Sequence, residues 1–399
     1  VTGTNGKTTV VTLLHEVLIR AGFRVGSVSS LRFKINDEER KNTLKMTMPG
    51  RGALQKFLAE CVREKCRYAI LEVTSEGVRQ FRHLFINFDC VAVTNVTPEH
   101  IESHGSFEAY RRSKVRFFSE TARGRRKMIL GGRIQKTLVV NLDDTEYRHF
   151  LISSADRRIG TTLRGAHDAA CHTIIPASDL SISDKGIRFA VGDVHIISRL
   201  RGGFNVQNIC TVLAIGEALG IPLPGIAESI RETAGVAGRL EKIETGRGFS
   251  VFVDYAHTPD ALEKVYGTLS DGGSPLICVL GAAGGGRDRW KRPEFGKLAS
   301  RFCREIILTN EDPYDEDPEA ILTDIESGFS QIQNPKTKIR KIIDRRGAIR
   351  EALARARTGD VVIITGKGAE PWMMGPRGSR IPWDDREVVR EELGGIQNH

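Results

Sequence analysis

A glycine-rich stretch at the start of the chain has the residue types of a phosphate-binding loop. It consists of Gly3, Thr4, Asn5, Gly6, Lys7, Thr8 and Thr9, and apolar residues at helical spacing follow over positions 10–18. Glycines let backbone N–H groups turn toward a polyphosphate, and the helix that follows adds positive potential. In such a loop Lys7 would reach the terminal phosphates and Thr8 would hold Mg²⁺. The stretch is shorter than the usual GxxxxGK[ST] pattern, so a chance glycine turn is the alternative.

Carboxylate, imidazole and amine groups follow later apolar runs. Glu72 lies at the end of one run, and Glu99, His100 and Lys114 come after the next. A carboxylate at the carboxyl end of a parallel strand would face the phosphate loop and could bind magnesium. Taken alone, Glu72 could equally cap a helix or be solvated. A lone histidine in a loop is more often structural than a metal ligand.

Two series of short apolar runs must position these groups. The first covers residues 68–73, 91–94, 127–130 and 137–141, and the second covers 249–254, 276–280, 305–309, 338–342 and 360–365. Longer amphipathic stretches alternate with them, including a helical pattern over 205–219, which is typical of βαβ units around a parallel sheet. We therefore expect an α/β protein with a phosphate-loop parallel-sheet domain over residues 1–237 and a Rossmann-like α/β domain over 238–399.

The composition limits the classes of partner. A net charge of +9 and a pI near 9.2 suit an anionic ligand, either nucleic acid or a phosphorylated metabolite. The basic residues lack the interleaved aromatics of a single-strand binding platform, so we expect no nucleic acid. No run of about 18 apolar residues and no signal peptide occur, which predicts a cytoplasmic protein without a membrane span. Seven scattered cysteines predict buried, reduced thiols.

Taken together, the motifs resemble those of the Mur ligase family along essentially the whole chain. The loop, Glu72, Glu99-His100 and Lys114 occur in the order and approximate spacing of the family's central domain. Residues 200–208 resemble LxGxFNxxN, 238–241 resemble GRxE, and 254–262 read DYAHTPDAL. Together with residues 366–370, which read GKGAE, these motifs point to the MurE-type branch, the UDP-N-acetylmuramoyl-tripeptide synthetases.

The resemblance implies an ATP- and Mg²⁺-dependent amide ligase. The γ-phosphoryl of ATP would pass to the carboxylate of a UDP-N-acetylmuramoyl peptide, and an amino acid would attack the acyl phosphate. Lys7, His100 and Lys114 are the implied catalytic residues. Thr8 and Glu72 would bind one magnesium ion, and His100 with carbamylated Lys114 would serve a second. The other implied ATP contacts are Asn208, Arg239, Asp254 and His257, with Arg239 reaching the phosphates when the domains close.

The resemblance also implies the substrate contacts. Thr47, Ser75 and Arg82 would hold the muramoyl peptide, and the amino acid would meet Glu311, Asp312, Tyr314, Gly366 and Glu370. Tyr314 stands where diaminopimelate-specific relatives have the arginine of DNPR. The acidic residues over 311–317 would attract a cationic side chain such as that of L-lysine. Alternatively, Arg287, Arg289 or Lys367 supplies the missing positive charge for meso-diaminopimelate.

Several alternatives remain open. The chain could be another amide ligase of the superfamily, of the folylpolyglutamate, cyanophycin or lipid II amidating type. From a different class, it could be a phosphate-loop nucleotide-binding protein without ligase activity. The family's N-terminal uridine-binding domain and the strand that should feed the loop are absent from these residues, so we expect a truncated sequence. We expect a monomer.

Overall fold

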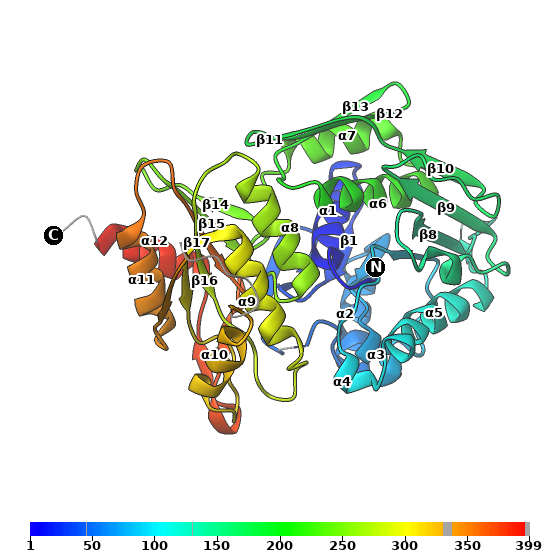
Figure 1. Cartoon of the computed structure of the whole chain (residues 1–399). Coiled ribbons are helices and arrows are strands. Elements are labelled where there is room, and N and C mark those ends of the chain that lie inside the picture. Colours follow the sequence, from blue (N-terminus) through cyan, green and yellow to red (C-terminus); the bar gives the residue numbers. More distant parts are fainter. Residues whose placement is uncertain (45, 130, 330–336, 396–399) are drawn as a thin grey trace. The chain divides into compact units, whose positions relative to one another are not determined.

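The computed structural model of the chain describes residues 1–44, 46–129, 131–329 and 337–395. These residues form two compact units (Figure 1). The first comprises Val1–Glu99 and His104–Ala234, and the second comprises His100–Ser103 and Gly235–His399. The division falls near the predicted domain boundary at residue 237, which remains a prediction. Each unit has its own sheet and its own hydrophobic core.

The first unit contains two four-stranded sheets. In one, the strand order is β3-β2-β1-β4, and β1 (Val25–Val28) runs parallel to β4 (Tyr68–Leu71). The antiparallel strands β2 (Arg32–Ile35) and β3 (Glu38–Lys41) complete its edge. In the other, the order is β10-β9-β8-β5 and every pairing is parallel. Its strands are β5 (Cys90–Val93), β8 (Thr137–Asn141), β9 (Arg157–Thr162) and β10 (Thr173–Pro176).

The first two residues of the chain bridge these sheets. The Val1 amine donates to the Leu71 carbonyl of β4 at 2.9 Å. The Thr2 N–H donates to the Ala92 carbonyl of β5 at 2.8 Å, and the Thr2 carbonyl accepts from Thr94 at 3.0 Å. The glycine-rich loop therefore starts at the carboxyl ends of β4 and β5, which is the edge where α/β sheets bind ligands.

Helices cover both faces of this layer in the first unit (Figure 1). On one face, α1 (Lys7–Arg20) packs on α6 (Phe204–Ala218) and α7 (Leu223–Glu232). On the other face lie α2 (Arg51–Arg63), α3 (Ser75–Arg79) and α5 (Phe107–Arg123), with the short α4 (Ile101–His104) preceding α5 in the chain. A 3₁₀ turn, Tyr147–Phe150, packs on α5.

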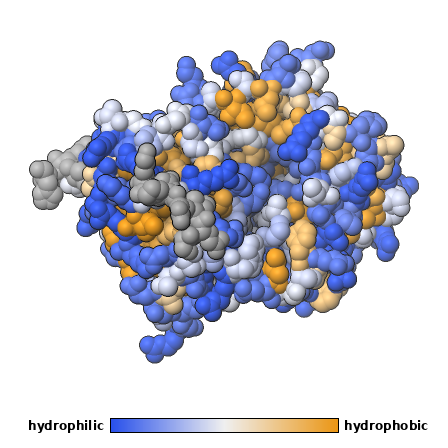
Figure 2. Space-filling model, viewed as in Figure 1, coloured by the Kyte–Doolittle hydropathy of each residue, from blue (hydrophilic) through white to orange (hydrophobic). Residues whose placement is uncertain are grey.

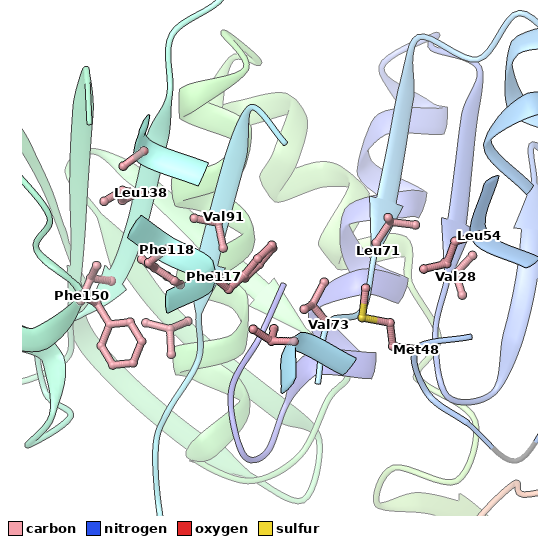
Figure 3. Packing of buried hydrophobic residues seen from close by; sticks show 14 of the residues in the cluster. Val28, Met48, Leu54, Leu71, Val73, Val91, Phe117, Phe118, Leu138 and Phe150 are labelled. Carbon is pink, nitrogen blue, oxygen red and sulfur yellow. The ribbon is translucent and has the colours of Figure 1, made fainter. Parts of the chain in front are cut away.

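Apolar side chains fill the space between the sheets and α2, α3 and α5 (Figure 3). Phe117 and Phe118 of α5 are at most 1% exposed and belong to one cluster with Val91, Leu138 and Phe150. Burying a phenyl side chain stabilises a fold by roughly 1.5–3 kcal/mol. The packing therefore fixes α5, the helix that carries Lys114, against the strands that end at the phosphate loop.

Two small antiparallel elements were not predicted. Strands β11 (Ser178–Ser183), β12 (Gly186–Val191) and β13 (Val194–Ser198) form a three-stranded sheet. The expectation that residues 127–130 continue the parallel sheet is wrong, because β6 (Met128–Ile129) pairs antiparallel with β7 (Gly132–Arg133) in an exposed hairpin. Residue 130 lies outside the described residues.

The second unit is built on a six-stranded sheet of order β14-β15-β19-β16-β17-β18. Only β14 (Glu241–Ile243) is antiparallel, and the parallel strands are β15 (Ser250–Asp254), β16 (Leu276–Leu280), β17 (Cys303–Leu308), β18 (Lys338–Lys341) and β19 (Val361–Thr365). Helices α8 (Pro259–Ser270), α9 (Lys291–Phe302) and α10 (Pro318–Glu326) pack in a row. The core lies between the sheet and helices α11 (Arg345–Arg355) and α12 (Asp385–Gly395). A hairpin of β20 (Trp372–Met374) and β21 (Arg380–Pro382) flanks the 3₁₀ turn Pro376–Gly378.

The parallel α/β architecture predicted for both parts of the chain is confirmed. Eight of the nine predicted runs form parallel strands, namely β4, β5, β8, β15, β16, β17, β18 and β19. The predicted helix over 205–219 is α6, and it ends before Gly220, whose φ of 75° suits glycine.

The prediction of reduced cysteines holds for five residues and is wrong for two. Cys278 of β16 and Cys303 of β17 form a disulfide with a Cα–Cα distance of 6.2 Å. The sequence spacing gave no sign of this pair, because the two residues meet only through strand pairing. The free thiols belong to Cys61, Cys66, Cys90, Cys171 and Cys210.

Hydrophilic residues cover most of the surface seen in Figure 2, and apolar patches interrupt it. Exposed apolar side chains in the β11–β13 sheet are those of Leu180, Ile182 and Ile197, which are 41–47% exposed. Among the described residues, no helix combines the length and apolar character needed to cross a membrane.

Candidate functional site

Backbone geometry explains the glycines of the phosphate loop. Gly6 is the N-cap of α1 and has a φ of 85°, and Gly3 has a φ of 146°. A Cβ atom at Gly6 would lie 2.1 Å from Asn208 Oδ1, and one at Gly3 would lie 2.0 Å from Thr94 Oγ1. Both approaches are too close for any side chain. The loop can therefore bring its N–H groups inward only with glycine at these two positions.

The segment after β5 holds the loop in place. The Asn95 side chain accepts from the Asn5 N–H at 2.9 Å and donates to the Asn5 carbonyl at 3.1 Å. Thr94 donates to the same carbonyl at 2.6 Å, and the Thr4 N–H donates to the Asn95 carbonyl at 2.8 Å. The Lys7 amine donates to the Thr4 carbonyl at 2.8 Å, so it folds back over the loop. Sequence reasoning did not assign Asn95 a role, although its place after a strand was a usable signal.

The structure brings the predicted magnesium pair together. The Thr8 hydroxyl donates to Glu72 Oε2 at 2.9 Å, and Glu72 is 2% exposed. Ser30 joins them, because its N–H donates to Glu72 Oε2 at 2.9 Å and its hydroxyl lies 2.8 Å from that of Thr47. Hydroxyl and carboxylate oxygens are ligands that Mg²⁺ prefers. Thr47, predicted to contact the peptide, thus lies beside the predicted metal position.

Lys114 is buried beside the loop. It is 1% exposed, its amine donates to the Gly3 carbonyl at 2.9 Å, and it lies 4.5 Å from the centroid of the Tyr110 ring. Burial lowers the pKa of Lys114 well below its usual value, and the charge of Lys7 lowers it further, while Glu99 opposes the shift. A neutral amine is the form that reacts with CO₂, which fits the predicted carbamylation.

Tyr110 is a site residue that the sequence did not reveal. Its hydroxyl lies 2.9 Å from the Thr4 hydroxyl, so it ties α5 to the loop. His100 belongs to the His100–Ser103 segment, which groups with the second unit, and has a φ of 57°. Its predicted metal role with Lys114 remains a prediction.

The other predicted first-unit residues also contact their surroundings. Arg82 donates to the Met48 carbonyl at 2.7 Å, so it fixes the backbone next to Thr47. Ser75 is buried, and its hydroxyl lies 3.2 Å from Nε2 of His104. Asn208 lies against Gly6 and donates to Asn205 at 2.8 Å, which orients its amide oxygen toward the loop. Thr9 is buried within α1.

In the second unit, Asp254 holds the turn that carries Arg239. Its carboxylate accepts from the Leu240 N–H at 2.5 Å and from the Ala256 N–H at 2.6 Å. Burial raises the pKa of Asp254, and Arg239 opposes the shift. The Arg239 guanidinium lies 4.5 Å from the centroid of the Tyr255 ring, an arrangement that stabilises its position.

His257 is held in its neutral form. Nδ1 lies 2.9 Å from the Tyr255 carbonyl oxygen, so Nδ1 is the donor. Burial lowers the pKa of His257 to about 3, and the nearby Lys291 adds to the effect. Nε2 is therefore an acceptor at neutral pH.

The acidic run over 311–317 does not form a free anionic surface. Asp312 accepts two bonds of 2.9 Å from the Lys367 amine and one of 2.7 Å from the Met374 N–H. Glu316 pairs with buried Arg292 at 2.8 Å. Asp315 accepts from the Arg377 N–H, and Asp317 caps α10. Internal partners therefore engage these carboxylates, and the predicted attraction of a cationic side chain by this run remains a prediction.

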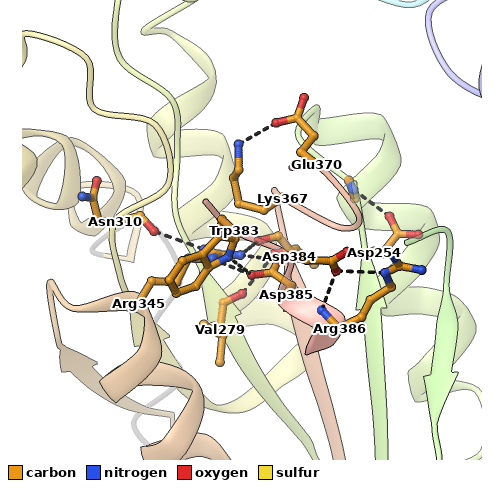
Figure 4. A network of polar contacts seen from close by, with 12 residues as sticks. Asp254, Val279, Asn310, Arg345, Lys367, Glu370, Trp383, Asp384, Asp385 and Arg386 are labelled. Atoms are coloured by element: carbon orange, nitrogen blue, oxygen red, sulfur yellow. Dashed lines mark hydrogen bonds and ion pairs between the residues drawn. The ribbon is translucent and has the colours of Figure 1, made fainter. Parts of the chain in front are cut away.

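A buried ionic network fixes the loops at the carboxyl ends of β16, β17 and β19 (Figure 4). Arg345 and Asp385 are both fully buried and form two hydrogen bonds, of 2.7 and 2.9 Å. Arg345 also donates to the carbonyls of Asn310, after β17, and Thr365, at the end of β19. These contacts make the edge of the sheet rigid.

Polar side chains on the loops at this edge contact one another. Tyr314 has a φ of 54°, and its phenol hydrogen-bonds the Arg287 guanidinium. Glu370 accepts from the Tyr255 hydroxyl at 3.0 Å and from Lys367 at 2.5 Å. Burial lowers the pKa of Lys367, but Glu370 and Asp312 outweigh it, so this amine stays charged. The Lys367 amine is thus paired with Asp312 and Glu370. Arg287, in contrast, is exposed.

Gly366 and Glu311 have a packing role. A Cβ atom at Gly366, whose φ is 109°, would lie 2.4 Å from Glu311 Oε2. Glu311 is 5% exposed, and burial raises its pKa, with Asp312 adding to the shift. The structure therefore places Glu311 behind the edge that carries Tyr314 and Glu370. Its predicted contact with an amino acid remains a prediction.

Known proteins resemble the chain along nearly its whole length. The model of the Mur ligase middle domain matches residues 1–216, and that of the Mur ligase, glutamate ligase domain matches 238–368. A UDP-N-acetylmuramyl-tripeptide synthetase of Roseiflexus sp. (strain RS-1) is 36% identical over 406 residues, covering 99% of this chain and 78% of the relative. The UDP-N-acetylmuramoyl-L-alanyl-D-glutamate–2,6-diaminopimelate ligase of Syntrophomonas wolfei is 33% identical over 399 residues, with the same two coverages.

Solved structures agree with these matches. A UDP-N-acetylmuramoyl-L-alanyl-D-glutamate–2,6-diaminopimelate ligase has a TM-score of 0.64 and 29% identity, covering 100% of this chain and 78% of its own. The folylpolyglutamate synthase of Mycobacterium tuberculosis complexed with ADP has a TM-score of 0.70 but only 16% identity, covering 92% of this chain and 86% of its own. The second likeness shows the fold alone.

Proposed function

The chain belongs to the Mur ligase family, and we propose that it is an ATP-dependent, ADP-forming amide ligase of the tripeptide synthetase type. It would add the third amino acid to UDP-N-acetylmuramoyl-L-alanyl-D-glutamate. The names of the two relatives support this substrate. The observation that carries the proposal is the contact between the Thr8 hydroxyl and the Glu72 carboxylate, 2.9 Å apart behind a glycine loop.

The residues present fit ATP and Mg²⁺. The loop offers N–H groups between Gly3 and Gly6, and Lys7 follows directly. Thr8 and Glu72 would hold Mg²⁺, which when bound would neutralise phosphate charge. In the reaction the substrate carboxylate would take the γ-phosphoryl group and release ADP. The amino group would then attack the acyl phosphate and release phosphate.

Carbamylation of Lys114 supports the same chemistry. The neutral amine would add to CO₂ and lose one proton, giving a carbamate with two anionic oxygen donors. The carbamate keeps one N–H, so the existing bond to the Gly3 carbonyl can persist. A carbamate would place a negative charge next to Lys7, which attracts it, whereas Lys7 repels an ammonium at this position. Such an oxygen group suits a second magnesium ion.

The second unit supports an amino acid with a zwitterionic distal end, such as meso-diaminopimelate. Arg287 offers a guanidinium that can pair with a carboxylate, and Glu370 offers a carboxylate for an ammonium group. Tyr314 supplies a hydroxyl that hydrogen-bonds Arg287. This proposal replaces the L-lysine preference that the acidic run suggested, because the run is engaged internally.

The function can be tested by ADP release from the purified protein. Release should require UDP-N-acetylmuramoyl-L-alanyl-D-glutamate and an amino acid together, and Glu72→Gln should reduce it by at least a hundredfold. ADP release that depends on a folate and glutamate, or on neither substrate, would show a different ligase or a nucleotide-binding protein without ligase activity.

The amino acid can be tested by comparing kcat/KM for meso-diaminopimelate, L-lysine and ornithine. Arg287→Leu should lower kcat/KM for meso-diaminopimelate about 10- to 100-fold, the loss expected for a charge-assisted hydrogen bond, and change the value for L-lysine less than threefold. Arg289→Leu is the matched control, since exposed Arg289 pairs with Asp324 instead. A wild-type preference of tenfold or more for L-lysine would contradict the proposed specificity.

A further inference from the structure

One histidine outside the predicted site connects several of its residues. His104 ends α4, and its ring meets the Tyr110 ring edge-on with centroids 5.4 Å apart. Tyr110 in turn reaches the phosphate loop through Thr4. On its other side, His104 faces Ser75, which starts α3. The ring therefore lies between the loop and a residue of the proposed peptide site.

The two ring nitrogens of His104 face two serine hydroxyls. Nε2 lies 3.2 Å from Ser75 Oγ, and Nδ1 lies 3.5 Å from Ser113 Oγ. Ser113 also donates to the Ala109 carbonyl at 3.0 Å. A serine hydroxyl has one proton, and a carbonyl oxygen can only accept. While Ser113 donates to Ala109, it can only accept from His104, so Nδ1 carries the imidazole proton.

The opposite tautomer is disfavoured by the distances. With Nδ1 unprotonated, the contact between Nδ1 and Ser113 would be a hydrogen bond only if Ser113 gave up its 3.0 Å bond to Ala109 and donated across 3.5 Å. Hydrogen bonds to oxygen and nitrogen acceptors are best at about 2.7–3.0 Å and weaken beyond that range. The shorter Ser113–Ala109 bond is therefore kept, and Nδ1 is the protonated nitrogen. Nε2 is then an acceptor, and the Ser75 hydroxyl donates a hydrogen bond to it.

We propose that His104 is a positioning residue that makes Ser75 a hydrogen-bond acceptor toward the muramoyl peptide. Because the Ser75 proton is held by His104, only the oxygen lone pairs remain for a ligand. Ser75 then accepts a hydrogen bond from an amide N–H of the peptide. The reacting carboxylate can only accept hydrogen bonds, so other groups must bind it. The inference rests on the proposed function for its ligand, but the state of the imidazole does not depend on any substrate.

The tautomer can be measured in the ligand-free protein by long-range ¹H–¹⁵N correlation NMR. The His104 signals are assigned by their loss in His104→Phe. We expect Nδ1–H in the wild type, and Ser113→Ala should shift the population toward Nε2–H because Nδ1 loses its acceptor. A wild-type ring protonated at Nε2 would overturn the proposal. This outcome does not depend on which substrates the protein joins.

Kinetics test the effect on the peptide. His104→Phe keeps a ring against Tyr110 and should raise KM for UDP-N-acetylmuramoyl-L-alanyl-D-glutamate about three- to tenfold, as expected for one neutral hydrogen bond. The kcat and the KM for ATP should change less than twofold. His195→Phe, at an exposed position of β13, is the control.

A double-mutant cycle separates positioning from general damage. If His104 acts through Ser75, the variant with both Ser75→Ala and His104→Phe should be no worse than Ser75→Ala alone. Additive effects, or an equal rise in KM for ATP, would overturn the proposal. Absence of ligase turnover in the wild type would instead overturn the proposed function and, with it, the assigned ligand, while the NMR result would still decide the tautomer.

Discussion

Burial of the Lys114 amine affects the stability of the protein. Burial lowers its pKa well below the usual value near 10.5, so the folded state binds a proton at Lys114 less tightly than the unfolded chain does. This loss of stability is largest below the folded pKa and declines as pH rises toward 10.5. Replacing the amine by an apolar group of similar length should therefore stabilise the protein.

We predict that Lys114→Met raises the free energy of unfolding at pH 7 by about 1 kcal/mol and lowers ligase activity at least a hundredfold. Calorimetry measures the first effect and ADP release the second. Adding bicarbonate should raise the melting temperature of the wild type but not of Lys114→Met, since only the wild type can form a carbamate. A variant that melts below the wild type would contradict this account of the buried amine.

Single residues also show what the sequence could and could not reveal. Thr8 and Glu72 were predicted as a pair, and they touch, because a loop residue and a strand-end carboxylate share one edge of a parallel sheet. Asn95 and Tyr110 were not predicted, because their roles depend on contacts with Asn5 and Thr4 across about 90 or more positions of sequence. The partners of the acidic run, Lys367 and Arg292, were not predicted either, because they lie outside the run in the sequence.

At the scale of elements, helix α1 offers a comparison of two glycines. Gly6 at its N-terminus and Gly22 just after its C-terminus have φ values of 85° and 86°. An added Cβ atom would meet Asn208 at Gly6 and nothing within 4 Å at Gly22. A left-handed conformation costs an alanine roughly 1–2 kcal/mol at either position.

We therefore predict that Gly22→Ala lowers the free energy of unfolding by about 1 kcal/mol and leaves kcat and KM unchanged. Gly6→Ala should have the same backbone cost and, because it displaces Asn208 and the loop, should also raise KM for ATP at least tenfold. Urea unfolding and steady-state kinetics give both quantities. Equal kinetic effects of the two variants would show that the loop does not depend on this close approach.

The segment after α3 contains an exposed residue in a strained conformation. Phe85 has a φ of 67° and is 85% exposed. Its left-handed backbone conformation is strained, and burial of the phenyl ring does not offset that strain. Asparagine tolerates this conformation better than other non-glycine residues. We predict that Phe85→Asn stabilises the protein by about 0.5–1 kcal/mol, measured by urea unfolding. Phe85→Ala keeps the strain and should give no gain, and a destabilised Phe85→Asn would contradict the prediction.

Helices and strands were predicted well where the apolar pattern was strong, and poorly where the apolar run was short. The buried parallel strands β8, β16 and β19 are continuous apolar runs, and these were recognised. Residues 127–130 are also apolar, but β6 is exposed and pairs with its own neighbour β7. A run of this length cannot show which partner it takes, since pairing is decided by tertiary contacts.

For the whole molecule, each unit carries a histidine that is kept neutral by burial. His15 in α1 contacts the Asn36 carbonyl, and burial lowers its pKa. Burial lowers the pKa of His257 to about 3. In the unfolded chain both would titrate near 6.5. Below that pH the unfolded state binds protons at both residues more tightly than the folded state does, so stability falls as pH falls.

We predict that His257 lowers stability by about 1 kcal/mol between pH 6 and pH 5, and that His15 acts in the same direction. Carboxyls with lowered pKa values, such as those of Glu316 and Asp324, lose their contribution only below about pH 4.5, so they do not act in this window. Buried Asp254 and Glu311 have raised pKa values, and any protonation in the folded state would oppose the fall. The histidine effect must therefore be isolated by substitution.

His257→Gln keeps a hydrogen-bonding side chain but removes the titration, so its unfolding free energy should depend less on pH than that of the wild type by about 1 kcal/mol between pH 6 and pH 5. His15→Gln should change the pH dependence in the same direction. Calorimetric scans at both pH values provide the comparison. If His257→Gln and the wild type lost stability in parallel, His257 would have to be protonated in the folded state, and its role as a neutral acceptor would be refuted.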